Sequence, residues 1–153
     1  MNIEITGIKC RSIIDAVGKI FVAGDDETLK KILCGIISGG HILFEDNPGL
    51  GKTLLVKVFA GVLGCNWKRI QFTPDILPSD IVGTKVWKGT SSEFELEKGP
   101  VFTNILLADE INRAMPKTQS ALLESMEEKQ VTIEGETHSL GPPFIVMATQ
   151  NPI

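Results

Sequence analysis

The stretch of sequence that decides the fold is GGHILFEDNPGLGKT, residues 39–53. Its apolar run at 41–44 predicts a short strand that is covered on both faces, as in a parallel sheet. A glycine-rich segment follows at 46–53, and the apolar spacing of residues 54–63 then predicts an amphipathic helix. A strand, a glycine-rich loop and a helix in this order are the setting of a phosphate-binding P-loop.

Each residue type in this loop fits a role in phosphate binding. Gly49 and Gly51 allow the backbone to turn, so that its N–H groups and the start of the helix face the phosphates. Lys52 would place its charge on the β- and γ-phosphates, and Thr53 would offer its hydroxyl to Mg²⁺. We therefore expect a run of nine consecutive residues to contact the nucleotide: Asp46, Asn47, Pro48, Gly49, Leu50, Gly51, Lys52, Thr53 and Leu54.

One position of the loop departs from the general P-loop pattern, because Asp46 stands where that pattern has glycine. An acid there would repel phosphate if it pointed into the loop. Because Asp46 ends the strand, it can point away. The alternative interpretation of the whole segment is a chance Gly-Lys-Thr at the start of a helix.

A second motif lies at the end of an apolar strand predicted at 104–109, where Asp109 and Glu110 follow one another. Ligands of parallel sheets bind at the carboxyl ends of the strands, so this pair and the P-loop are expected at one edge. Asp109 would hold Mg²⁺, and Glu110 would orient and deprotonate the attacking water. The alternative is that the pair only gives the next helix an acidic N-terminus.

A third strand, predicted at 144–149, leads to Asn151 at the same edge. The side chain of Asn151 could hydrogen-bond the γ-phosphate or the attacking water. Alternatively, an asparagine before proline is an ordinary turn residue.

The rest of the chain fits an α/β protein in which strands alternate with helices around a parallel sheet. The other predicted elements are helices at 10–22, 26–38 and 116–129, and a strand at 68–73. Two further segments, at 84–98 and 131–140, alternate in hydrophobicity around a turn and predict inserted β-hairpins. These hairpins could contact a partner, or they could only be structural edges.

Composition limits the classes of function that remain. The chain has 153 residues, enough for one domain, and its formal net charge is −4 with acids and bases interspersed. We therefore expect no nucleic-acid partner, and no apolar stretch is long enough to predict a membrane span. Three widely spaced cysteines favour reduced thiols in the cytoplasm over a disulfide or zinc site.

Together these motifs resemble the MoxR family of AAA+ ATPases. The stretches that carry the resemblance are GGHILFEDNPGLGKT (39–53), RIQFTPDILPSDIVGT (69–84), KGPVFTNILLADEINRAMPKTQSALLESMEEKQVTIEG (98–135) and PFIVMATQNPI (143–153). The resemblance implies a P-loop NTPase parallel sheet with flanking helices and inserted β-hairpins, which is a partial AAA+ core. In the family, Lys52 and Thr53 match Walker A, Asp109 and Glu110 match Walker B, and Asn151 matches the sensor-1 asparagine.

The resemblance implies further roles that the spacing of residues does not show. Val22 and Gly24 fall in a segment that lies near adenine in such proteins. Arg113 either reaches a neighbouring subunit or makes a surface salt bridge. The hairpin at 84–98 matches an insert facing the central pore of a ring, and the one at 131–140 matches a pre-sensor hairpin.

The resemblance also implies a domain division and a set of partners. Residues 1–153 would be the N-terminal part of the AAA+ large α/β subdomain, without its C-terminal strand, arginine finger and helical lid. Family members form rings, usually hexamers, and work as chaperone-like ATPases with client proteins or a von Willebrand factor A domain protein. Because a finger supplied in trans accelerates phosphoryl transfer by orders of magnitude, we expect this chain to bind ATP and Mg²⁺ but to hydrolyse ATP slowly. We also expect the P-loop strand to be an edge strand that is prone to self-association.

Three functions compete at this point. The leading hypothesis is Mg²⁺-dependent ATP hydrolysis that drives remodelling or maturation of partner proteins. The alternative is a nucleotide-binding regulatory fragment without significant turnover. A small-molecule kinase or GTPase is disfavoured, because the sequence contains neither an Asn-Lys-x-Asp base-reading motif nor a visible acceptor site.

Overall fold

The centre of the molecule is a four-stranded parallel sheet. The computed structural model describes the chain in four segments, at 3–21, 25–45, 51–89 and 93–150. In their order across the sheet, the strands are β1 (Ile42–Glu45), β8 (Ile145–Gln150), β5 (Ile105–Asp109) and β2 (Trp67–Gln71). The predicted parallel α/β sheet is confirmed, and β1 is an edge strand of this sheet as expected.

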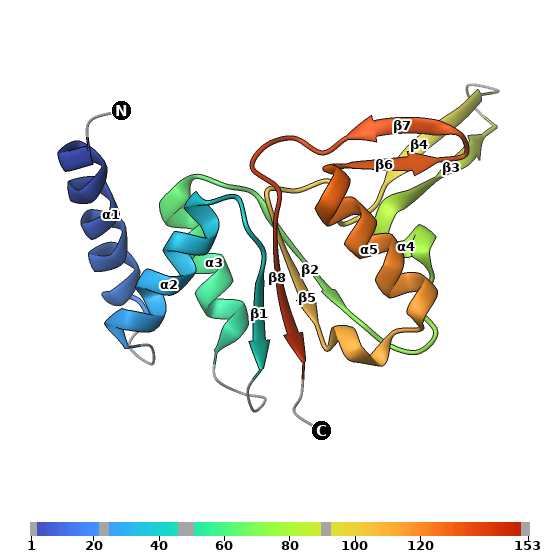
Figure 1. Ribbon diagram of the computed structural model, residues 1–153. Helices are drawn as coiled ribbons and strands as arrows, with labels where there is room; N and C mark the ends of the chain where they lie inside the picture. Colours follow the sequence, from blue (N-terminus) through green and yellow to red (C-terminus); the bar gives the residue numbers. More distant parts are fainter. Residues whose placement is uncertain (1–2, 22–24, 46–50, 90–92, 151–153) are drawn as a thin grey trace.

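The sheet separates two apolar cores, and the register of its strands decides which residue enters which core. Leu107 lies opposite Met147 on β8, and both belong to the core that also contains side chains of α1 (Ile3–Gly18), α2 (Asp26–Ile37) and α3 (Lys52–Leu63). The alternate strand residues, such as Leu106 and Val146, enter the opposite core. Figure 1 shows α1, α2 and α3 on one side of the sheet and α4 (Pro78–Val82) and α5 (Pro116–Glu128) on the other. Covering on both faces explains why β5 and β8 read as continuous apolar runs.

The ends of the helices follow from short polar or glycine signals. The carboxylate of Asp25 accepts a hydrogen bond from the Thr28 N–H at 2.6 Å and caps α2. Gly64 ends α3 in the left-handed conformation, and Pro116 begins α5. The predicted helices at 26–38, 54–63 and 116–129 are therefore confirmed to within a few residues.

The first helix was predicted with the wrong bounds. The apolar spacing suggested residues 10–22, whereas α1 runs from Ile3 to Gly18. Its first turns carry no regular apolar stripe, so periodicity missed them. At the other end the helix stops at Gly18, although the apolar residues continue to Phe21, which packs into the core beyond the helix.

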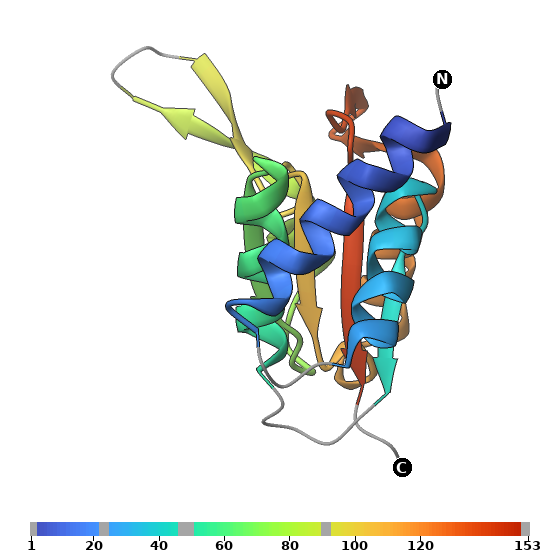
Figure 2. The same cartoon turned by 90° about the vertical axis from the view of Figure 1, so that its left-hand side faces the viewer.

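Both inserted hairpins are confirmed. The first pairs β3 (Gly83–Lys88) with β4 (Glu93–Lys98), and the second pairs β6 (Gln130–Ile133) with β7 (Glu136–Ser139). Figure 2 shows the first hairpin extending away from the body of the molecule. An ion pair of 2.6 Å between Lys85 and Glu136 joins the two hairpins.

Two short elements were not predicted. Helix α4 has five residues, and the Asp80 carboxylate accepts a hydrogen bond from the Leu77 N–H at 2.8 Å at its start. The 3₁₀ helix η1 (Ile111–Arg113) follows the acidic pair directly. Neither element is long enough to show a helical period, which is the reason that pattern analysis missed both.

Candidate nucleotide site

The start of α3 is built for an anion. Gly51 precedes the helix in the left-handed conformation, with φ 71° and ψ 24°, and as a glycine it offers no side chain to cap the first turn. The first turn also contains no acidic residue. The N–H groups at a helix start have no partner within the helix, and the helix dipole adds positive potential there. Together these features make the start of α3 suitable for phosphate.

Gly51 is favoured by the tight space around it as well as by its conformation. A Cβ atom at this position would lie 3.2 Å from Cε2 of Phe21, whose ring is buried at the end of the N-terminal segment. Lys52 and Thr53 follow in the first turn of α3, and Leu54 is partly exposed beyond them. The structure thus places Gly51, Lys52 and Thr53 at the start of the helix that follows β1 in the chain.

Several predicted site residues lie outside the described segments. They are Val22, Gly24, Asp46, Asn47, Pro48, Gly49, Leu50 and Asn151. The strand and the helix that flank the predicted loop, β1 and α3, are both present. At the end of β8, the side chain of Gln150 donates a hydrogen bond to the Glu45 carboxylate at the end of β1.

Asp109 ends β5 with both carboxylate oxygens engaged. Its side chain is only 12% exposed, and Oδ2 accepts a hydrogen bond from Arg69 Nε at 2.6 Å. Oδ1 accepts a hydrogen bond from the Thr149 hydroxyl at 3.2 Å. A carboxylate in such a position needs partners because burial disfavours an unpaired charge. The two partners come from the strands on either side of β5, so the sheet itself orients Asp109.

Glu110 adopts a backbone conformation that is uncommon for a residue with a side chain. Its φ of 55° and ψ of 48° lie in the left-handed region, and its N–H donates to the Thr149 hydroxyl at 2.9 Å. Such a conformation costs about 1–3 kcal/mol, and Lys129 and Glu134 also adopt a positive φ in this chain. The turn at Glu110 ends the strand and carries the chain into η1.

The carboxylate of Glu110 accepts two hydrogen bonds from neighbouring side chains. Gln71 Nε2 donates at 3.0 Å from β2, and Arg113 Nη1 donates at 2.8 Å from η1. The salt bridge that was one alternative for Arg113 is thus present within the chain. Glu110 is held at the sheet edge by groups that sequence analysis had not connected with it.

Asp109 and helix α3 lie on the same face of the sheet. Asp109 continues the alternation of Ile105 and Leu107, whose side chains share the core with α3. The loop after β1 leads into the start of α3, and Figure 1 shows the ends of β1, β5 and β8 at the same edge of the sheet. The expected convergence of the P-loop helix and the acidic pair therefore agrees with the arrangement of the elements.

Three residues of this network were missed by sequence analysis: Arg69, Gln71 and Thr149. The signal available for two of them was polarity at alternate positions of β2, since Arg69 and Gln71 point to the same face. Their partners lie about 40 residues away in the sequence, as in the Gln71 to Glu110 separation of 39. Only the strand order β8-β5-β2 brings these side chains together.

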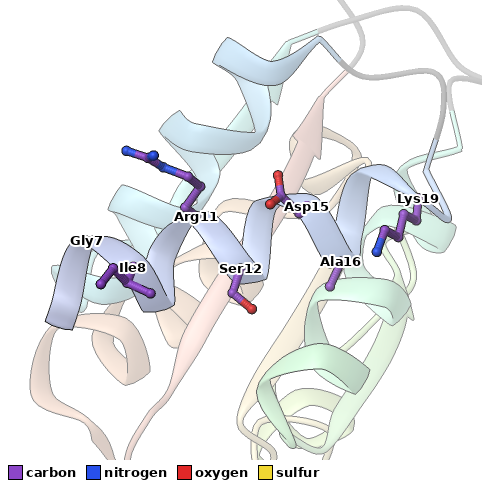
Figure 3. Close-up of a pocket in the computed structure, with 7 residues that line it drawn as sticks. All are labelled: Gly7, Ile8, Arg11, Ser12, Asp15, Ala16 and Lys19. Carbon is purple, nitrogen blue, oxygen red and sulfur yellow. The ribbon is translucent and has the colours of Figure 1, made fainter.

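A large groove elsewhere on the molecule does not have the features of a ligand site. Its volume is about 930 Å³, and it is lined by Gly7, Ile8, Arg11, Ser12, Asp15, Ala16 and Lys19. Figure 3 shows these side chains spread along α1 rather than turned toward one point. Ligand sites usually present a few convergent polar groups, so this groove is not a second candidate site.

Comparison with known proteins gives a consistent result. The sequence model described as "ATPase family associated with various cellular activities (AAA)" matches residues 41–153. The chain is 53% identical over 135 residues to the chaperone MoxR1 of Mycobacterium tuberculosis, covering 88% of this chain and 36% of that protein. It is 49% identical over 140 residues to the uncharacterised protein YeaC of Bacillus subtilis, covering 92% of this chain and 43% of that one.

A solved structure is equally similar. The crystal structure of a proposed ATPase from Cytophaga hutchinsonii has a TM-score of 0.84 and 52% identity, covering 95% of this chain and 44% of that one. The resemblance to MoxR proteins is therefore confirmed, and so is the partial P-loop NTPase fold. The chain spans less than half the length of these relatives.

Proposed function

Because this chain belongs to the ATPase family associated with various cellular activities, we propose that it carries the phosphate-binding and water-activating groups of an ATP-hydrolysing site. The observation that carries the proposal is the position of Asp109 and Glu110. Asp109 is the last residue of the buried strand β5, and Glu110 follows it at the same edge of the sheet. Asp109 also lies on the face of the sheet that packs against α3. In this proposal, residues 1–153 form the N-terminal part of an AAA+ large α/β subdomain.

ATP would bind with its phosphates at the start of α3. The backbone of residues 46–51 would surround the phosphates, and Lys52 would place its charge on the β- and γ-phosphates. Val22 and Gly24 would lie near the adenine, as the resemblance implies. Asn151, after β8, would hydrogen-bond the γ-phosphate or the attacking water.

The residues present fit a magnesium ion that is held jointly with the nucleotide. Thr53 supplies a hydroxyl and Asp109 a carboxylate, and Mg²⁺ is usually bound by one or two carboxylates together with phosphate oxygens and waters. Within the described segments no group of three or more His, Cys, Asp or Glu forms an all-protein cage. A bound Mg²⁺ would supply neutralisation of the charge on the transferred phosphoryl group.

Glu110 would orient the attacking water and accept its proton. Gln71 and Arg113 both donate to Oε2 of the Glu110 carboxylate. Those two donors fix the direction of the carboxylate. The left-handed turn at Glu110 sets where the carboxylate leaves the strand.

The biological role of ATP hydrolysis concerns the whole protein, of which residues 1–153 are a part in this proposal. We propose chaperone-like remodelling or maturation of partner proteins by a homo-oligomeric, hexameric ring, with a von Willebrand factor A domain protein as a partner class. The support is the resemblance to MoxR proteins, of which MoxR1 is named a chaperone. The cysteines Cys10, Cys34 and Cys65 are free thiols, which suits work in the reducing cytoplasm. In the described segments no helix is long and apolar enough to cross a membrane.

A Glu110→Gln substitution separates hydrolysis from binding. The amide keeps the shape of the side chain but cannot take a proton, so phosphate release should fall by roughly a hundredfold or more. The affinity for ATP, measured by calorimetry, should stay within about threefold of wild type. If this chain is instead a regulatory nucleotide-binding module, wild type and variant will release phosphate at the same background rate.

A further inference from the structure

Arg69 lies beside the acidic pair but is not part of the P-loop or of the pair itself. It sits on the edge strand β2, opposite Leu107 of β5, on the face that also carries Asp109. Its Nε donates to Asp109 Oδ2 at 2.6 Å, and its Nη2 donates to Gln71 Oε1 at 3.1 Å. The Gln71 amide in turn donates to Glu110. Arg69 thus contacts one acid directly and reaches the other through one side chain.

The ion pair with Asp109 is unevenly exposed. The Arg69 side chain is 49% exposed, whereas that of Asp109 is 12% exposed. A largely buried carboxylate that loses its counter-ion is left with an uncompensated charge, which is strongly unfavourable. Asp109 therefore benefits from a neighbouring cation, and Arg69 supplies one.

From this geometry we propose that Arg69 is a positioning residue that sets how strongly ATP binding depends on a divalent ion. The inference rests on the proposed function, in which Asp109 also faces Mg²⁺. Without the metal, Arg69 neutralises Asp109, so the carboxylate does not repel the triphosphate. With the metal, the Asp109 carboxylate is shared between Arg69 and Mg²⁺, so Arg69 weakens the attraction of the carboxylate for Mg²⁺.

Removing the charge of Arg69 therefore has two effects with the same sign. Metal-free ATP meets an uncompensated carboxylate and binds more weakly. A divalent ion meets a carboxylate that Arg69 no longer neutralises and is attracted more strongly. Both effects raise the ratio between the affinity for ATP with Mg²⁺ and the affinity without it.

The test is the affinity of the chain for a fluorescent ATP analogue, measured in EDTA and in excess Mg²⁺. In Arg69→Gln the ratio of the two affinities should rise by about tenfold, which corresponds to about 1.4 kcal/mol. Arg69→Lys keeps the charge and should stay near the wild-type ratio. The matched control is Lys68→Gln, which removes the same charge one residue away on the opposite face of β2, where the side chain is exposed. Its ratio should change by less than about twofold.

A second measurement keeps the inference testable if Arg69→Gln fails to fold. In the wild-type chain the Nε–H of Arg69, identified by NMR through its loss in Arg69→Lys, should be protected from exchange with solvent in the metal-free ATP complex. Addition of Mg²⁺ should shift this signal and reduce its protection. The inference about Arg69, but not the proposed function, is overturned if folded Arg69→Gln keeps the wild-type ratio of ATP affinities in Mg²⁺ and in EDTA. The same holds if Mg²⁺ leaves the Nε–H signal unchanged. A wild-type chain that binds no nucleotide in either condition overturns the proposed function as well.

Discussion

At the scale of single residues, the candidate site depends on two backbone positions with left-handed geometry. Gly51 opens α3 at φ 71°, and Glu110 ends β5 at φ 55°. The first is a glycine, for which this conformation is inexpensive, whereas the second is not. A side chain at position 51 would be disfavoured both by this φ and by the Phe21 ring.

Gly51→Ala tests the first position. The added Cβ would meet the buried Phe21 ring and adopt an unfavourable φ, so we expect about 1–3 kcal/mol lower stability and at least about tenfold weaker ATP binding. The matched control is Gly61→Ala in the last turn of α3, where a Cβ meets nothing within 4 Å. That change should raise stability by about 0.5–1 kcal/mol, because alanine is the better helix former. Thermal unfolding and nucleotide titration of both variants measure these effects, and equal stabilisation by the two would contradict the account.

At the scale of elements, His41 joins three parts of the chain at the start of β1, at the opposite end of this strand from the loop that leads to α3. Its Nδ1 accepts a hydrogen bond from the Val146 N–H at 2.9 Å, and its Nε2 lies 3.2 Å from the Met126 carbonyl of α5. Nζ of Lys129 lies 2.8 Å from the same Nε2. Because Nδ1 accepts, the neutral ring with its proton on Nε2 is the form that fits.

The stability of the fold should therefore fall in mild acid. Burial, and then the charge of Lys129, lower the pKa of His41 below its ordinary value of 6.5. The unfolded chain binds the proton more readily, so stability is fully present above pH 6.5 and is lost as the pH falls toward the folded-state pKa. In His41→Asn, whose amide oxygen can still accept from Val146, the dependence of unfolding on pH between 7.5 and 5 should be flatter. His138→Asn serves as the comparison. If the pH dependence of unfolding became flatter in His138→Asn and not in His41→Asn, its assignment to His41 would be refuted.

At the scale of the whole molecule, the two hairpins lie away from the sheet edge that carries the candidate site (Figure 1). One core contains side chains of α1, α2 and α3. The core on the opposite face of the sheet contains residues of α5 and β6. Strand β1 is an open edge among the described strands, and Leu43 on it is 53% exposed. Self-association of the chain through the edge of β1 stays a prediction.

Sequence analysis located the parts of the fold that depend on local pattern. Apolar runs predicted β1, β5 and β8, and the helices α2, α3 and α5 were predicted to within a few residues. The start of α1 and the short α4 and η1 were missed, because none shows a regular apolar period. In the candidate site, local motifs singled out Lys52 and Asp109, whereas Arg69 and Thr149 depended on strand order, which no local pattern contains.

The central claim is that the start of α3 and the end of β5 form a single site, and a double-mutant cycle tests it most directly. Thr53→Ala and Asp109→Asn each remove one proposed contact to the same Mg²⁺, so each should reduce the Mg²⁺-dependent gain in ATP affinity by about tenfold or more. Because one ion links the two side chains, the double variant should lose little more than either single variant. The claim would be contradicted if the losses of Mg²⁺-dependent ATP affinity in the two single variants added up in the double variant. It would also be contradicted if Asp109→Asn left the ATP affinity in Mg²⁺ unchanged.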